Sequence, residues 1–434
     1  MAAGSAREMR EAMVLGRVIG GEDKGLPVEA AGLTVGEYLA TKPELSEFWT
    51  PLLVLSEDAL QNNVRYFADW VADRGLELMP HGKTTMAPQL WQQQLDAGAT
   101  GITVANPSQL KVARAHGFET LMLANQLADQ NALRWVAGEL EHPECTIWSW
   151  VDSTAAVRLA EEALRGLKPS RPLSVLVELG SPGKRTGCRT VEEALAVAEA
   201  VAASPVLRLA GVAGYEGALG HDRNTPTVEL IRGYVADLLE LHGKLAHLYD
   251  GGDVLVTCGG SNYPEIVGDL FAEARQADSA RYVLRSGAYI THDDGAYRAL
   301  SPFDRQRVSG RARSLVPAAH GLSRVLSQPE PGLALLDGGR RDFPYDSGYP
   351  VPQAAVSAAT GQVTALEGAV VDDMNDQHSF LRTAAGQEPA VGDLVVLGLS
   401  HPCTTFDKWR LIPTVKDLVP GKDAVIKRLV ETYF

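Results

Sequence analysis

The sequence predicts an α/β protein that combines a parallel (β/α)8 barrel with a second, mainly β domain. Between residues 76 and 300, apolar strand-like runs alternate with stretches that can form helices, which is the pattern of a parallel barrel. Beyond Ser301 the runs are short and β-type, and Gly and Pro turns separate them. A doubly wound open sheet is the alternative, but no G-x-G-x-x-G motif follows the first run.

Eight apolar runs account for the predicted barrel, and each of the first seven precedes a stretch with helical character. The barrel runs are residues 76–80, 101–105, 120–124, 146–151, 173–179, 208–214, 253–257 and 281–285. The β-type runs of the second domain are residues 308–316, 334–336, 355–356, 363–371, 393–399 and 410–415.

One further apolar run, residues 52–55, is left over once the barrel is complete. We expect this strand to belong to the second domain, so that both ends of the chain contribute to that domain. Residues 36–48 could form a short helix, whereas residues 1–35 show no strong period. The expected domains are a leader and joining strand at 1–56, a barrel at 57–300 and a β-rich domain at 301–434.

Composition excludes several classes of function. The chain has 434 residues with a net charge of -14, which argues against binding to a nucleic-acid backbone. The four cysteines show no CxxC spacing, so neither a disulfide framework nor a four-thiolate zinc site is indicated. No apolar run reaches membrane-spanning length, and charges interrupt the first 21 residues. We therefore expect a cytoplasmic protein.

Lys83 is the leading candidate for a catalytic residue. It follows a strand-like run and a glycine, and it precedes a helix that opens with Pro88. A lysine at the carboxyl end of a barrel strand can lose solvation, which lowers its pKa and makes it a nucleophile for a carbonyl group. The sequence therefore favours a lysine that forms a Schiff base, although a solvated turn lysine would also fit.

Two further candidates follow the fifth and sixth barrel runs. The glycine-rich turn after residue 179 could place Arg185 across the mouth of the barrel, where a guanidinium would keep a heterocyclic nitrogen unprotonated. Tyr215 lies beside Gly214 and could hydrogen-bond a cofactor. A surface arginine on a loop and a tyrosine that caps the core are the structural alternatives.

The seventh and eighth runs end in turns that could bind a phosphate. Gly259, Gly260 and Ser261 follow the seventh run, and Gly287 follows the eighth. Glycines expose backbone N–H groups, and loops at these two positions often hold a phosphate in barrels of this kind. Most single Gly-Gly-Ser turns are only turns, but two such turns on adjacent strands strengthen the interpretation.

The second domain contains a candidate metal site. His401 and Cys403 would share one face of an extended segment, and imidazole and thiolate are good zinc ligands. A buried cysteine beside a core histidine is the alternative. Acidic residues precede His378, which could act as a partner of a metal ligand or as a proton relay, or could lie in a solvated loop.

Four motifs occur in the order that one enzyme family shows. They are Pro80-His81-Gly82-Lys83-Thr84, Arg185-Thr186-Gly187, Gly259-Gly260-Ser261 and His401-Pro402-Cys403-Thr404-Thr405. Together they resemble the D-serine dehydratase and D-threonine aldolase family, which are fold type III pyridoxal-phosphate enzymes related to alanine racemase. The resemblance covers roughly residues 50–434.

The resemblance implies an alanine racemase-like barrel, a D-serine dehydratase-like β domain and a homodimer. It also implies that Lys83 binds pyridoxal 5'-phosphate covalently and that Arg185 lies near its pyridine nitrogen, with Tyr215 beside the cofactor. The implied phosphate contacts come from Gly259, Gly260, Ser261, Gly287 and Tyr289. His401 and Cys403 would hold a divalent metal, which is zinc in the dehydratases. The family often has a histidine or lysine where this chain has Thr85 and Met86.

These assignments favour elimination of water from a β-hydroxy D-amino acid, which gives a 2-oxo acid and ammonia. Lys83 would remove the α-proton, and the metal would make the hydroxyl a leaving group. Aldol cleavage to glycine and an aldehyde is the alternative, but the resembling aldolases usually show H-x-D in place of H-x-C. A non-catalytic cofactor carrier would resemble the barrel alone. A racemase would need a second base, which the sequence does not identify; Tyr345 and Tyr349 are candidates.

Overall fold

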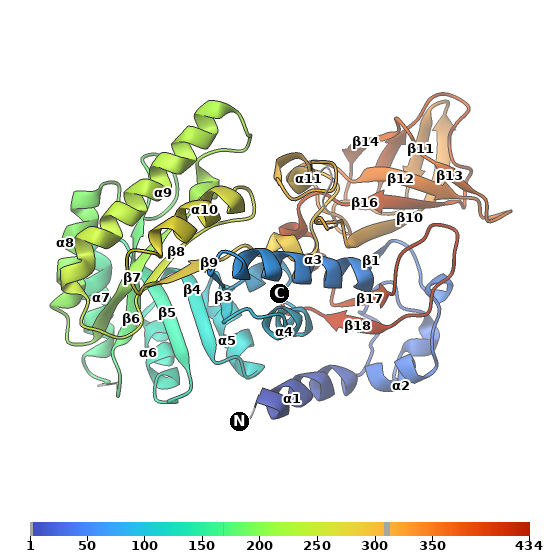
Figure 1. The fold of residues 1–434 in the computed structure, drawn as a ribbon. Coiled ribbons are helices and arrows are strands. Elements are labelled where there is room, and N and C mark those ends of the chain that lie inside the picture. The colour runs from blue at the N-terminus through green and yellow to red at the C-terminus, as the bar shows by residue number, and fades with distance from the viewer. Residues whose placement is uncertain (1–2, 168, 308–312) are drawn as a thin grey trace. The chain divides into compact units, whose positions relative to one another are not determined.

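The computed structural model describes residues 3–167, 169–307 and 313–434. The chain divides into two compact units, which are described separately below (Figure 1). The first, called the β unit, comprises Met1–Tyr66, Thr84–Gln93 and Ala288–Phe434. The second, called the barrel unit, comprises Phe67–Lys83 and Gln94–Gly287. The chain passes between the two units at four places, one of which lies between the consecutive residues Lys83 and Thr84.

The barrel unit contains an 8-stranded parallel sheet in the order β2-β9-β8-β7-β6-β5-β4-β3. The N–H groups of Thr100 and Thr103 donate to the carbonyls of Leu78 and Pro80, at 2.8 and 3.0 Å. These bonds join the two ends of the strand order, so the sheet closes into a barrel and the predicted (β/α)8 fold is confirmed. The strands are β2 (Glu77–Leu78), β3 (Ile102–Val104), β4 (Thr120–Gln126), β5 (Thr146–Val151), β6 (Leu173–Leu179), β7 (Leu207–Gly214), β8 (Leu255–Cys258) and β9 (Arg281–Leu284).

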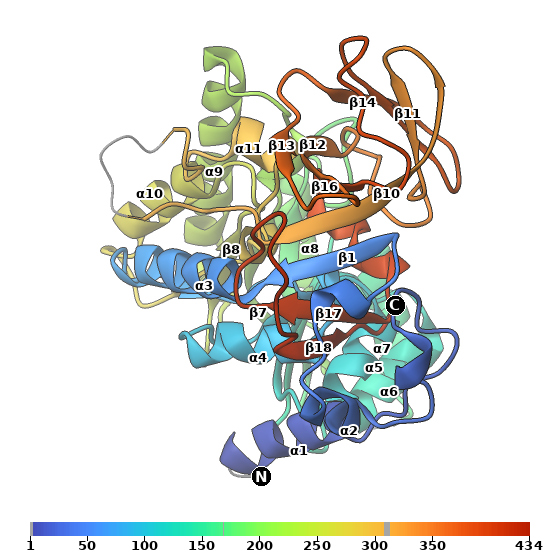
Figure 2. The ribbon, with the colours of Figure 1, turned by 90° about the vertical axis from the view of Figure 1, so that its right-hand side faces the viewer.

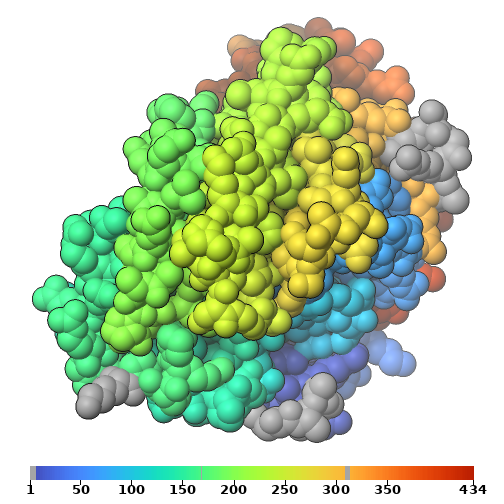
Figure 3. Space-filling view, turned by 60° about the vertical axis from the view of Figure 1, so that its left-hand side comes forward, coloured from blue at the N-terminus to red at the C-terminus, as the bar shows by residue number. Residues whose placement is uncertain are grey.

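The crossover helices begin where the sequence supplies a cap. Asn106, Ser153 and Thr190 each accept a hydrogen bond from a backbone N–H of the first helical turn, as N-cap residues do. The helices are α3 (Glu57–Ala72), α4 (Pro88–Asp96), α5 (Pro107–Ala115), α6 (Gln130–Glu139), α7 (Thr154–Leu164), α8 (Val191–Ala202), α9 (Thr225–Leu245) and α10 (Pro264–Ala274). Figure 3 shows α8, α9 and α10 side by side on the outer face of the barrel unit, coloured green to yellow.

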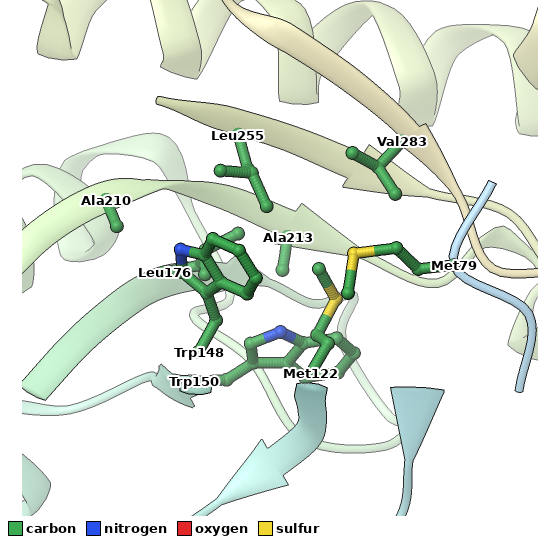
Figure 4. Packing of buried hydrophobic residues seen from close by; sticks show 9 residues of the cluster. All are labelled: Met79, Met122, Trp148, Trp150, Leu176, Ala210, Ala213, Leu255 and Val283. Atoms are coloured by element: carbon green, nitrogen blue, oxygen red, sulfur yellow. The ribbon is translucent and has the colours of Figure 1, made fainter. Parts of the chain in front are cut away.

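Side chains from nearly every strand fill the interior of the barrel. Trp148 and Trp150, two residues apart on β5, both point inward because successive side chains of a strand face opposite sides. Figure 4 shows their indoles packed among Met79, Met122, Leu176, Ala210, Ala213, Leu255 and Val283. This interior is a packed core rather than a channel, so the polar groups described below lie at the carboxyl ends of the strands.

The β unit is built on a second sheet, in which β1 (Leu52–Ser56) is central. This strand pairs antiparallel with β10 (Ala319–Glu330) and parallel with β17 (Leu411–Val415). Figure 2 shows β1 in blue between β10 in orange and β17 in red. Residues from both ends of the chain therefore meet in one sheet. The remaining strands are β11 (Leu333–Leu336), β12 (Val351–Val356), β13 (Val363–Ala365), β14 (Val370–Met374), β15 (Ser379–Arg382), β16 (Leu394–Gly398) and β18 (Arg428–Glu431).

Several details of the β unit differ from the sequence prediction. The expected run at 363–371 is divided between β13 and β14, because Gly368 adopts a φ of 74° in the turn between them. The long strand β10 was not predicted. Of the expected run at 308–316, residues 308–312 lie outside the described residues, and Leu315 forms an isolated bridge with Asp304.

The N-terminal segment packs against the C-terminal strands of the same unit. It contains α1 (Ala3–Leu15) and α2 (Val35–Ala40), and α2 begins with a capping box formed by Thr34 and Glu37. Arg17 forms ion pairs with Asp23 and with Glu431 of β18. The helix expected over 36–48 is shorter than predicted, because α2 ends at Ala40. A single 3-10 turn (Leu45–Glu47) follows it.

Candidate active site

Lys83 lies where the sequence placed it, in a turn at the carboxyl end of a barrel strand. Strand β2 ends at Leu78, and a 3-10 turn (Gly82–Thr84) contains the lysine, which is half-buried. Gly287 packs against this segment so closely that a Cβ atom on it would be 2.5 Å from the carbonyl oxygen of His81. Glycine is required at position 287 because any side chain would displace the lysine turn.

The ring of His81 lies among three cations of the barrel unit. Burial and the positive charges of Lys83, Arg285 and Arg185 hold the pKa of His81 well below its usual value. The imidazole is therefore neutral near pH 7. Its Nδ1 atom is buried and has no hydrogen-bond partner among the described residues. A buried ring atom without a partner, surrounded by cations, marks a place where a ligand with anionic groups would bind.

Arg285 is the most buried of these cations and was not singled out from the sequence. Its side chain is 3% exposed, and it donates to Thr257 Oγ1 and to the Gly214 carbonyl, each at 2.6 Å. The guanidinium carbon lies 4.8 Å from the centroid of the Trp150 ring. An arginine directly after an apolar strand was the available signal, because a charged residue is rarely buried unless it is paired.

Glu178, at the end of β6, is a second ionisable residue that the sequence analysis did not single out. Its side chain is buried and accepts a hydrogen bond from Gln126. Burial raises the pKa of Glu178, although the hydrogen bonds from Gln126 and Thr186 act in the opposite direction. An acid inside an apolar strand run was the signal that could have revealed it.

Arg185 and Tyr215, to each of which the family resemblance gave a separate role beside the cofactor, lie close to each other. The Arg185 guanidinium carbon is 5.1 Å from the centroid of the Tyr215 ring, and the arginine side chain is exposed. A Cβ atom on Gly260 would be 2.8 Å from Cε2 of Tyr215. The tyrosine ring is therefore held between the arginine and the turn that follows β8.

The turn that follows β8 binds a carboxylate of the protein itself. The N–H groups of Gly259 and Gly260 donate to the carboxylate of Glu216, at 3.0 and 2.8 Å. Ser261 is half-buried in the same turn. Tyr289, which was expected to contact the phosphate, is buried and belongs to the β unit, in a 3-10 turn (Ala288–Ile290).

In the β unit, His401 has an unusual backbone conformation that a neighbouring acid stabilises. Its φ is 56°, which non-glycine residues rarely adopt and which often marks a functional position. The N–H of His401 donates to Asp293 Oδ2 at 2.9 Å. Asp293 is 4% exposed and also accepts from the N–H groups of Gly295 and Tyr297. This buried carboxylate fixes the turn that carries the histidine.

The side chains of His401 and Cys403 interact, and each has a further polar contact. His401 Nδ1 lies 2.6 Å from Asp346 Oδ2, and Cys403 Sγ lies 3.5 Å from Thr84 Oγ1. Burial lowers the pKa of His401, but the hydrogen bond and charge of Cys403 and the carboxylate of Asp346 outweigh it and raise the pKa to about 9. Without a metal, the ring is a cation held between two acidic groups.

The pair offers suitable donors for a soft divalent metal. Asp346 occupies Nδ1, which leaves Nε2 of His401 for a metal, as in other carboxylate-supported histidine ligands. Across the part of the chain that the structure describes, no group of three or more His, Cys, Asp or Glu side chains is arranged to hold a metal ion. A metal at His401 and Cys403 would thus keep positions open for water or substrate.

His378 lies in the hairpin that joins β14 and β15, and its side chain is exposed. Its backbone carbonyl accepts a hydrogen bond from the N–H of Asn375. Its proposed catalytic role stays a prediction.

The barrel unit fits pyridoxal 5'-phosphate in two respects. It offers a half-buried lysine for the aldehyde and positive charge for the phosphate. The one poor fit is the Gly259–Gly260 turn, because both of its N–H groups are already hydrogen-bonded.

Comparison with known proteins identifies both parts of the chain. Residues 55–249 match the family described as alanine racemase, N-terminal domain, and residues 318–415 match the putative serine dehydratase domain. The 3-hydroxy-D-aspartate aldolase of Paracoccus denitrificans is 26% identical over 74% of this chain and 80% of its own. The D-threo-3-hydroxyaspartate dehydratase of a Delftia species is 28% identical over 32% of this chain and 35% of its own.

Solved structures show the same fold. A D-threonine aldolase from Filomicrobium marinum superimposes with a TM-score of 0.73 at 22% identity, covering 90% of this chain and 96% of the other. A metal-free cysteine-to-alanine variant of D-threo-3-hydroxyaspartate dehydratase gives a TM-score of 0.70 at 19% identity, covering 89% and 98%.

The fold and the two matched domains define an alanine racemase-like enzyme with an antiparallel β second domain. The chain belongs to the D-serine dehydratase and D-threonine aldolase family, as its motifs suggested, and it is a lyase. In the described residues, no helix is both long enough and apolar enough to cross a membrane.

Proposed function

We propose that this protein is a pyridoxal-phosphate- and metal-dependent lyase that removes water from a β-hydroxy D-amino acid, giving a 2-oxo acid and ammonia. The observation that carries the proposal is the contrast between two groups of charged residues, one in the barrel unit and one in the β unit. In the barrel unit the positive charges of Lys83, Arg285 and Arg185 act on His81 and lower its pKa, whereas in the β unit His401 interacts with Cys403 and Asp346, which raise its pKa.

The barrel residues supply the groups for cofactor binding and proton transfer. When bound, the cofactor would supply an electron sink for the carbanion that forms at the substrate's Cα. Lys83 Nζ would bind it covalently and later accept the α-proton, a step that requires an uncharged amine.

The β-unit residues would hold a divalent metal, and we propose zinc. Nε2 of His401 and the Cys403 thiolate would be its two protein ligands, a combination that suits zinc better than harder cations. The metal would act as a Lewis acid on the β-hydroxyl group and stabilise it as a leaving group.

Aldol cleavage to glycine and an aldehyde is the second candidate, because two of the compared relatives are aldolases. The thiolate ligand favours elimination. A cysteine-to-alanine and a histidine-to-alanine variant were made in the dehydratase relative, one of them in a metal-free form, and these are the residue types of the pair found here.

Analysis of the reaction products distinguishes elimination of water from aldol cleavage. The purified protein, loaded with pyridoxal 5'-phosphate and zinc, is incubated with D-serine, D-threonine and D-threo-3-hydroxyaspartate. We expect a 2-oxo acid and ammonia in equal amounts. Glycine with an aldehyde would instead establish the aldolase reaction, and no turnover of any of these substrates would refute both readings.

A further inference from the structure

Both amides of the turn after β8 are bound by one buried side chain. Gly259 N–H donates to Oε2 of Glu216 at 3.0 Å, and Gly260 N–H donates to Oε1 at 2.8 Å. The carboxylate thus binds the turn with one oxygen per amide. Gly259 has a φ of 103°, a conformation that favours glycine.

Further contacts fix this arrangement within the barrel unit. Glu216 is 0% exposed and begins the 3-10 turn (Glu216–Ala218) that follows β7. The Cys258 thiol donates to Oε2 at 3.3 Å. The carbonyl of Gly260 accepts from Ser286 Oγ at 2.6 Å, so both backbone groups of this glycine are paired.

The buried negative charge has a compensating positive charge. Arg285 is buried in the same unit, and the charge of Glu216 acts to raise the pKa of Arg285 against the effect of burial. A buried carboxylate without such compensation would be costly.

Successive backbone amides of a glycine turn usually bind an external anion such as a phosphate. Here the protein supplies that anion. Resting on the proposed function, we propose that Glu216 is a fixed internal anion that positions the Gly259–Gly260 turn. The phosphate of pyridoxal 5'-phosphate then binds to other donors of the molecule, and Glu216 is a positioning residue that never leaves the turn.

The Gly259–Gly260 turn also restricts the position of the Tyr215 ring. A Cβ atom on Gly260 would be 2.8 Å from Tyr215 Cε2, so a small shift of the turn moves the tyrosine ring and with it the Arg185 guanidinium above the ring. Loss of the Glu216 carboxylate should therefore weaken cofactor binding although the carboxylate does not touch the cofactor.

The test compares Glu216→Gln with Glu265→Gln. Glutamine at 216 keeps the shape but directs an NH2 donor at one of the two amide donors, whereas Glu265 lies in α10 and pairs with Arg223 instead. Hydrogen exchange of the cofactor-free protein measures how strongly the backbone amides of the turn are protected. Absorbance titration with pyridoxal 5'-phosphate measures the Kd of the cofactor. We expect faster exchange in the peptide that contains Gly259 and Gly260, and a Kd at least about tenfold higher, only for Glu216→Gln.

The result would differ if the Glu216 carboxylate bound the two amides only until the cofactor phosphate displaced it. If Glu216→Gln binds pyridoxal 5'-phosphate as tightly as the wild type or more tightly, the phosphate uses the two amides and the proposal is wrong. Should this variant fail to fold, Glu216→Ala with added acetate replaces it: acetate should restore slow exchange of the turn, and unchanged exchange with and without acetate would also refute the proposal. A wild-type protein that binds no pyridoxal 5'-phosphate would instead refute the proposed function.

Discussion

Two histidines, one in each unit, show how the same side chain acquires opposite properties. In the barrel unit, burial and three cations keep His81 neutral. In the β unit, Cys403 and Asp346 overcome the effect of burial and raise the pKa of His401 to about 9. The first environment has an excess of positive charge and the second an excess of negative charge.

The difference favours a different kind of ligand in each unit. An excess of positive charge in a buried site favours anions such as a phosphate or a carboxylate, and an excess of thiolate and carboxylate favours a metal cation. A lyase that uses an anionic cofactor and a metal needs both environments. Each prediction below removes or alters one side of this contrast.

Replacement of Lys83 should have the largest effect. Lys83→Ala should lower kcat by roughly 10²- to 10⁴-fold, which is the usual contribution of a general base. It should also abolish the visible absorbance of the lysine-bound cofactor. Lys111→Ala, which removes an exposed lysine on α5, is the matched control and should leave both measurements unchanged. An unaltered spectrum in Lys83→Ala would refute the assignment of Lys83 as the lysine that binds the cofactor.

The buried and exposed arginines of the barrel unit should differ in their effect on stability. Arg285→Ala leaves two buried acceptors, Thr257 Oγ1 and the Gly214 carbonyl, without their donor and should lower the free energy of unfolding by about 1–3 kcal/mol for each. Arg185→Ala removes an exposed side chain and should change it by less than about 0.5 kcal/mol. Denaturant unfolding measures both. Equal effects of the two substitutions would contradict the burial argument.

The carboxylate beside His401 should control metal affinity. Asp346→Asn should weaken zinc binding by about 10- to 100-fold, because the amide no longer stabilises the ring orientation in which Nε2 faces the metal. Competition with a chromophoric chelator gives the Kd. Asp376→Asn, at an exposed position of the same unit, should leave it unchanged. Wild-type affinity in Asp346→Asn would show that this carboxylate does not support the ligand.

The two histidines should give the metal-free protein opposite pH dependences. The folded pKa of His81 lies below its unfolded value near 6.5, so the unfolded state binds the proton first and stability falls as pH drops below about 6.5. The folded pKa of His401 is raised, so its contribution is fully present below about 6.5 and is lost as pH rises through about 9.

Each effect is limited to about 1.4 kcal/mol per pH unit and group. Denaturant unfolding at pH 5 to 9 measures the profile. His81→Gln should flatten its acidic side, and His401→Gln its alkaline side. A profile that neither substitution alters would refute the charge contrast.

The barrel strands were readily predicted because parallel strands are buried on both faces and appear as continuous apolar runs. All eight predicted runs overlap strands of the barrel sheet. Strand β10 was missed because its second half is largely exposed and contains Pro329, so it lacks an apolar run. In the candidate site, the sequence identified the residue types that carry unusual chemistry, such as Lys83 and the H-x-C pair.

The sequence by itself determined the alternation of strands and helices, the lysine after the first barrel strand and the spacing of His401 and Cys403. These features depend on residues close together in the chain. Only the tertiary structure decided that His81 is neutral and His401 protonated, that Arg285 is buried, and that Glu216 occupies the amides expected to bind phosphate. The physical reason is that charge and solvation depend on groups brought together from distant positions, which no local pattern records.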